Sequence, residues 1–118
     1  MKRNMDLIRE ILLRIESFPE PLGRIDLNID EFSPKEIFYH VKLLSEAGLL
    51  EATSIHTIGM FEWYANSLTW EGHEFLEAAR NDNIWNKAKK LVLDKTGSLP
   101  FDILKQTLIG IIKRAILS

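Results

Sequence analysis

The feature that most restricts the fold of this sequence is a helix with clear signals at both ends. Ser33 can accept a hydrogen bond from a backbone N–H, and Glu36 completes a capping box with it. Pro34 takes a first-turn position, where its missing N–H is not needed, and Gly48 is placed to end the helix. The residues between them separate into an inner stripe of Ile37, Val41, Leu44 and Ala47 and an outer side of Lys35, Tyr39, Lys42 and Glu46. The sequence therefore predicts an amphipathic helix over residues 33–48.

The pattern of a β-hairpin follows this helix. Leu49 to Ile55 and Phe61 to Thr69 are rich in β-branched and aromatic residues, and Gly59 lies in the turn region between them. Ahead of the helix, residues 24–29 alternate polar and apolar side chains, as a short half-buried strand does. We therefore expect a strand at 24–29 and a two-stranded hairpin after the helix.

Helical periodicity covers both ends of the chain. Residues 4–17 repeat apolar side chains every three or four positions and stop before Pro19. Thr69 is placed to cap a helix that ends near residues 81–83, and a further helix should stop near Gly97. The apolar positions of a last helix are Leu104, Leu108, Ile111, Ile112, Ala115 and Ile116. The predicted order is helix, strand, helix, hairpin and then helices, which is an α+β chain.

Composition limits the organisation and the chemistry of the chain. Its 118 residues, 46% of them hydrophobic, suffice for one core, so we expect a single domain over 1–118, with a core at 1–83 and a helical extension at 84–118. The absence of cysteine excludes disulfides, thiolate zinc sites and thiol nucleophiles. The start of the chain lacks the apolar stretch of a secretory signal, and no apolar run approaches the roughly 18 residues of a membrane span. We expect a cytoplasmic protein.

Charge is distributed unevenly along the chain. Residues 1–83 carry 8 basic and 15 acidic side chains, whereas residues 84–118 carry 7 basic and 2 acidic ones. Either the basic tail docks on the acidic front of its own chain, or it faces an anionic partner.

Two segments resemble winged-helix transcription regulators. The run from Tyr39 to Leu50 is similar to the end of a recognition helix and the first wing strand, and the run from Ser67 to Gly72 is similar to the second wing strand entering the next helix. This resemblance implies a winged helix with a two-stranded wing and additional C-terminal helices.

The chain also resembles, over essentially its whole length, a domain-of-unknown-function family of small bacterial and prophage proteins. The segments that carry this resemblance are Met1–Arg9, Tyr39–Val41, Leu68–Leu76 and Ile84–Lys87. It implies a fold and a mobile-element setting, but no activity, since a fold does not fix a function.

The sequence departs from the regulator pattern before the capped helix. Only residues 29–32 lie between the predicted first strand and Ser33, where regulators place an entire second helix. The second helix is therefore short or missing. Because that helix seats the recognition helix on the DNA backbone, its loss weakens the case for ordinary groove docking.

Candidate nucleic-acid contacts follow from the regulator resemblance. Lys35, Tyr39, His40 and Lys42 would make groove and phosphate contacts, joined by His56 and Thr57 near the wing tip. The alternative is a solvated or packing face in which His40 is partly buried. The wing carries no Lys or Arg, and Glu62 follows its tip, which argues against tight duplex binding.

Two functional hypotheses remain open at this point. The leading one is a winged-helix regulator-like module, of prophage or mobile-element origin, that binds double-stranded DNA weakly or as a dimer. The competing one is a protein-protein interaction module on the same scaffold, without DNA binding.

Chemistry-bearing motifs are sparse in this sequence. His73 and Glu77 stand one turn apart, but one such pair falls short of the three or four ligands of a zinc site. A nucleophile elbow, a phosphate-binding glycine loop and a spaced carboxylate pair are all missing. We expect no catalytic residues, no metal and no cofactor, and hence no enzyme.

The last predicted helix has a wide apolar face. A homodimer through Leu104, Leu108, Ile111, Ile112 and Ile116 would cover this face. The alternative is that the face closes over the first helix of its own chain.

Overall fold

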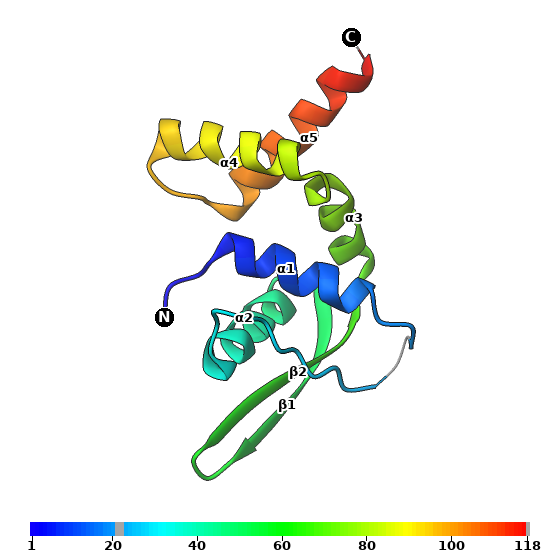
Figure 1. The fold of residues 1–118 in the computed structure, drawn as a ribbon, viewed down its shortest axis with the longest axis vertical. Helices are drawn as coiled ribbons and strands as arrows, with labels where there is room; N and C mark the ends of the chain where they lie inside the picture. Colours follow the sequence, from blue (N-terminus) through cyan, green and yellow to red (C-terminus); the bar gives the residue numbers. More distant parts are fainter. Residues whose placement is uncertain (21–22, 118) are drawn as a thin grey trace. The chain divides into compact units, whose positions relative to one another are not determined.

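The computed structural model describes residues 1–20 and 23–117. Within them the chain is α+β, with five helices and one two-stranded antiparallel sheet (Figure 1). The elements in chain order are α1 (Met5–Glu16), α2 (Pro34–Glu46), β1 (Leu50–Thr57), β2 (Met60–Leu68), α3 (Trp70–Ala79), α4 (Asp82–Thr96) and α5 (Phe101–Leu117). All five helices and both hairpin strands confirm the elements predicted from periodicity and turn signals.

The chain divides into two compact units, Met1–His73 and Glu74–Ser118, and the boundary falls inside α3. The sequence predicts a single domain with a core at 1–83 and a helical extension at 84–118. The first unit holds α1, α2 and the hairpin, and the second holds most of α3 with α4 and α5.

Helix α1 supplies a large share of the first unit's core. The Asn4 side chain caps it by accepting from the Leu7 backbone N–H at 3.0 Å. The stripe on its inner face is buried and consists of Met5, Leu7, Ile8, Ile11, Leu12 and Ile15. The helix contacts α2 and β2, so this stripe fixes where both of them lie.

The hairpin is built around a two-residue turn at Ile58 and Gly59, because Thr57 pairs with Met60. Gly59 has a φ of 79°, a conformation that glycine adopts at little cost. A bulge at Asn66 interrupts the register near the base of the hairpin. Asn66 accepts from the Thr53 hydroxyl at 2.9 Å and donates to the Gly23 carbonyl at 2.8 Å, which ties the preceding loop to the sheet.

The strand predicted at residues 24–29 is wrong except at one position. Ile25 makes a single bridge to Ala65, and the chain then leaves the sheet. The Arg14 guanidinium donates to the Asn28 carbonyl at 3.1 Å, and Ile29 is buried. These tertiary contacts draw residues 28 and 29 toward α1 and away from the neighbouring strand. A turn at residues 30–32 then leads directly into α2.

Aromatic packing organises the second unit. The Phe75 ring lies 6.3 Å from that of Trp85 and 4.9 Å from that of Phe101, which joins α3, α4 and α5 around one side chain. Asn81 caps α4 through the Ile84 N–H at 3.0 Å. Ala88 and Val92 are buried on α4, whereas Leu91 is exposed.

Gly72 lies in the part of α3 that belongs to the first unit, and it tests how closely α3 approaches the backbone of Leu49. A Cβ at position 72 would overlap the backbone carbonyl oxygen of Leu49, and a backbone atom cannot move aside as a side chain can. We expect Gly72→Ala to lower the free energy of unfolding by about 1 to 3 kcal/mol, measured by urea denaturation. Gly110→Ala is the matched control, because a Cβ there meets nothing within 4 Å. Gly110→Ala should raise the free energy of unfolding by roughly 0.5 to 1 kcal/mol. Similar losses of stability in the two variants would contradict the close approach of α3 to Leu49.

Candidate functional site

The helix α2 is held at both ends as the sequence predicts. The Ser33 hydroxyl accepts from the Glu36 N–H at 3.2 Å, and the Glu36 carboxylate accepts from the Ser33 N–H at 3.1 Å, with Pro34 in the first turn. At the other end Gly48 has a φ of 78°, and the Leu49 N–H donates to the Leu44 carbonyl at 2.9 Å. The caps therefore define where α2 begins and ends, and with that which residues lie on its outward face.

Three predicted contact residues lie on that outward face. Lys35 is exposed, and Tyr39 and Lys42 are half-buried. The Lys42 ammonium pairs with the Glu46 carboxylate at 3.1 Å, one helical turn away. This pairing compensates the charge that Lys42 would offer to a phosphate.

His40 is a correction to the predicted nucleic-acid contacts, because its side chain is only 1% exposed. Its Nε2 accepts from the Asn4 backbone N–H at 2.9 Å. Since an N–H can only donate, Nδ1 carries the proton and donates to the Glu36 carbonyl at 2.8 Å. Both ring nitrogens are thus used inside the unit, and His40 ties the start of α1 to α2. Its position three residues after Ile37, on the buried stripe, is the sequence signal that points to this role.

The tip of the hairpin is apolar and exposed. Ile58 is fully exposed, Met60 is 54% exposed and Phe61 is 45% exposed. His56 and Thr57, predicted to contact nucleic acid, are exposed beside them. The tip extends beyond α2, away from α1 (Figure 1). Apolar side chains held out in this way are typical of a surface that a partner covers.

A hollow of about 540 Å³ separates the hairpin tip from the N-terminal half of α2. Its lining combines Lys35 and Tyr39 of α2 with the hairpin tip and the first residue of the chain, and comprises Met1, Lys35, Tyr39, Gly59, Met60 and Phe61. We call this hollow, together with the exposed tip, the α2–hairpin surface. The structure brings Lys35 and Tyr39 together here as expected, but Met1, Met60 and Phe61 were not predicted.

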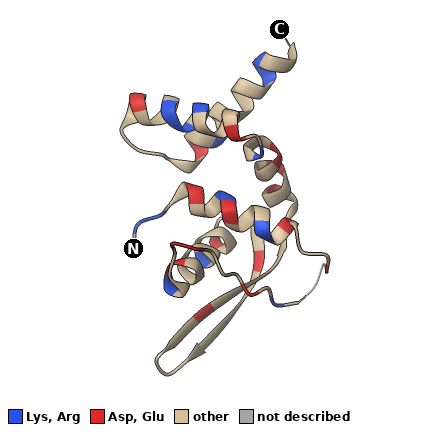
Figure 2. Ribbon diagram, in the orientation of Figure 1, with Lys and Arg blue, Asp and Glu red and all other residues tan. Residues whose placement is uncertain are grey.

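Electrostatically, the α2–hairpin surface is a poor match to duplex DNA. Neither strand nor the turn between them carries a Lys or Arg, as the absence of blue on the hairpin in Figure 2 shows. The first unit as a whole has 7 basic and 12 acidic side chains over residues 1–73. Affinity for DNA depends mainly on neutralised phosphates, so this charge balance disfavours it.

Aromatic side chains pack against one another along the hairpin. His56, Phe61 and Trp63 contact one another with ring centroids 5.3 to 6.3 Å apart. Tyr64 packs edge-on against Phe38 at 5.4 Å. Its hydroxyl donates to the Glu62 carboxylate at 2.7 Å, and this bond raises the pKa of Tyr64 above its ordinary value. These contacts give the exposed tip a rigid base.

A smaller hollow of about 80 Å³ lies behind this base, between Trp63 and the departing segment at Asp26 and Leu27. The Trp63 Nε1 atom is buried and has no acceptor among the described residues. The hollow exceeds the roughly 10 to 15 Å³ that a water molecule requires.

Neither a metal cluster nor a membrane span is found in the part of the chain that the structure describes. No group of three or more His, Asp or Glu side chains there could hold a metal ion. None of the helices there combines the length and the apolar character needed to cross a bilayer.

Comparison with known proteins places the chain in a family. Residues 2–98 match the family described as "Hypothetical protein (DUF2513)". The chain belongs to this family. It is also 42% identical over 107 residues to a protein of Haemophilus influenzae described as uncharacterized, and the match covers 90% of this chain and 91% of that protein. No solved structure matches the chain.

Helix α5 begins after the residues that match the DUF2513 family. Two of the residues predicted for a dimer interface on it, Leu104 and Leu108, are fully buried. This is a correction, because side chains with no exposed surface cannot meet a second copy. Ile111 and Ile112 are half-buried, and Ile116 is 72% exposed.

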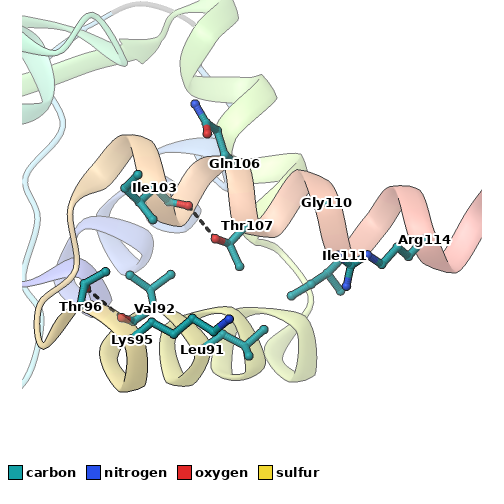
Figure 3. Close-up of a pocket in the computed structure, with 10 residues that line it drawn as sticks. All are labelled: Leu91, Val92, Lys95, Thr96, Ile103, Gln106, Thr107, Gly110, Ile111 and Arg114. Atoms are coloured by element: carbon teal, nitrogen blue, oxygen red, sulfur yellow. Dashed lines mark hydrogen bonds between the residues drawn. The ribbon is translucent and has the colours of Figure 1, made fainter.

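An open hollow of about 430 Å³ lies between α4 and α5 (Figure 3). Its walls are mainly apolar, and Lys95 and Arg114 also line it. The hydroxyls of Thr96 and Thr107 donate to backbone carbonyls of their own helices, at 2.8 and 2.7 Å. The lining also includes Gln106.

The structural role of His40 can be tested by substitution. His40→Leu keeps a similar volume but removes two hydrogen bonds, so we expect a loss of about 1 to 3 kcal/mol in the free energy of unfolding. Urea denaturation measures it. The same change at exposed His56 should stay within roughly 0.5 kcal/mol. A His40→Leu protein as stable as the unchanged chain would show that these bonds contribute nothing.

Proposed function

We propose that this protein is a winged-helix-like protein-protein interaction module, and that its α2–hairpin surface is the binding site. The observation that carries the proposal is the exposed, uncharged hairpin tip of Ile58, Met60 and Phe61 beside the 540 Å³ hollow. Burying such side chains against a partner is favourable by about 25 cal/mol per Å² of apolar area. The polar rim supplied by Lys35 and Tyr39 fits the usual arrangement of an apolar centre with polar edges.

DNA binding, as in a regulator of mobile-element origin, is the competing proposal. It is supported by exposed Lys35 on the outward face of α2, next to the hairpin. Three observations weigh against it: His40 is buried, Lys42 is paired with Glu46, and the hairpin lacks basic residues. A helix that reads DNA needs side chains that reach base edges and phosphates, and Lys35 is the one exposed cation of α2.

Site-specific crosslinking distinguishes the two proposals. With the photoreactive residue p-benzoylphenylalanine at Met60, we expect nuclease-resistant adducts to a protein in bacterial cells that express the chain. The same residue at Trp70, which is exposed elsewhere in the first unit, should give none of these adducts. Mass spectrometry identifies the adduct. Electrophoretic mobility-shift assays with duplex DNA fragments should show no complex at micromolar concentrations of the protein and low salt.

Two lysines provide the matched control. Lys35→Gln should reduce the Met60 adduct several-fold because Lys35 lines the hollow, whereas Lys42→Gln should leave it unchanged because Lys42 lies outside. Nuclease-sensitive adducts, or a salt-sensitive complex with duplex DNA, would favour the competing proposal instead.

Self-association through the end of α5 is a separate proposal. It is supported by Ile116 and Leu117, which are 72% and 79% exposed in the last turn of the helix. Light scattering should give twice the chain mass of 13.7 kDa. Replacing both residues with Glu should restore the chain mass, while Ile58→Glu at the hairpin tip should not. A chain mass for the unchanged protein rules this proposal out.

A further inference from the structure

The edge of β2 that faces away from β1 has a defined set of outward backbone groups. The Ile25 N–H donates to the Ala65 carbonyl at 2.9 Å, so the backbone groups of Ala65 point away from β1. The direction of these groups alternates along an antiparallel strand, and the register is regular from the turn to Ala65. The N–H and C=O groups of Phe61 and Trp63 therefore point to the same outer edge.

Within the described chain, no strand occupies this edge beyond the Ile25 bridge. The segment that would continue the pairing is held elsewhere, by the Arg14 bond to the Asn28 carbonyl and by the burial of Ile29. An edge with unpaired N–H and C=O groups is a template for another strand. Asp26 and Leu27 still line the 80 Å³ hollow beside Trp63, so the edge of β2 is clear of its own chain only toward the tip, at Phe61.

The 540 Å³ hollow adjoins this same edge. Phe61 belongs to this edge and also lines the hollow, together with Met60. On the opposite wall stand Tyr39 and Lys35, and no acidic residue lines the hollow. Backbone pairing beside a hollow of this chemistry is the arrangement by which sheet edges recognise extended peptides.

We propose that an extended segment of a partner protein adds to the distal end of β2 as a third strand, pairing with the backbone of Phe61. The segment places an apolar side chain over Met60 and Tyr39 and a carboxylate near Lys35. The inference rests on the proposed function and specifies the form of the partner. An extended segment is favoured over a helix because only an extended backbone offers donors and acceptors at the strand spacing.

The outer edge of β1 is the natural comparison. His56 lies directly opposite Phe61 in the register, so its N–H points to the outer edge of β1 as that of Phe61 points to the outer edge of β2. The hollow is lined by residues of β2 and the turn, and by none of β1. Two proline substitutions can therefore remove one outward N–H from each edge, while the bonds between β1 and β2 remain.

The test uses peptides selected for binding to the whole chain. A phage-displayed library of random ten-residue peptides is enriched on the protein, and the tightest binder is synthesised. We expect Phe61→Pro to weaken its binding at least tenfold and His56→Pro to change it less than threefold. Phe61→Ala, which keeps the N–H, should lie between them. Dissociation constants from fluorescence anisotropy give these ratios.

N-methylation of the peptide tests the pairing without altering the protein. Blocking N–H groups at alternate peptide positions should abolish binding, and blocking the positions between them should not, since only every second residue faces β2. The inference is overturned if no peptide is enriched, if both prolines weaken binding equally, or if methylation has no alternating effect.

The crosslink from position 60 separates this inference from the proposed function. If the protein adduct persists in the Phe61→Pro chain, the surface binds a partner and strand addition is wrong. If the unchanged chain forms no protein adduct, the proposed function fails as well.

Discussion

The path of residues 26–29 is the constraint on which the rest of the candidate surface depends. A local alternating pattern favours pairing with β2, but Ile29 gains more by entering the core, and Arg14 holds the neighbouring carbonyl of Asn28. Burying an isoleucine contributes about 1.5 to 3 kcal/mol, which exceeds the roughly 0.5 to 1.5 kcal/mol net of one strand hydrogen bond. The segment follows the stronger interaction, and the sheet stops at two strands with one bridge.

The same competition shows how far the sequence could predict this fold. Helix ends marked by local chemistry, such as Ser33 with Glu36 or Gly97 after α4, lie where the sequence places them because their partners are a few residues away. The strand at 24–29 is lost because its rival contacts come from α1, and no local pattern contains them. Leu104 and Leu108 show the same limit of sequence-based prediction. The sequence shows that a helix has an apolar face, but it does not show which part of the protein packs against that face.

The candidate surface was predictable in part. Lys35 and Tyr39 follow from the helical period once the capped start of α2 is known. His40 was misassigned because a polar side chain was placed outside, although its spacing from Ile37 and Val41 puts it on the buried stripe. Met1 and Phe61 join the surface only because tertiary packing brings the start of the chain and the hairpin tip beside α2.

Electrostatics and hydrophobic exposure lead to the same reading of this surface. A wing that bound phosphates would keep charge at its tip and bury its apolar residues, whereas here Ile58 and Met60 are exposed and the basic residues of the hairpin are absent. Stiff aromatic contacts at His56 and Trp63 limit the entropy lost when a partner covers the tip. The open edge of β2 supplies directional bonds that an apolar patch lacks. An apolar tip alone would bind many partners, and backbone pairing at Phe61 would restrict it to extended ones.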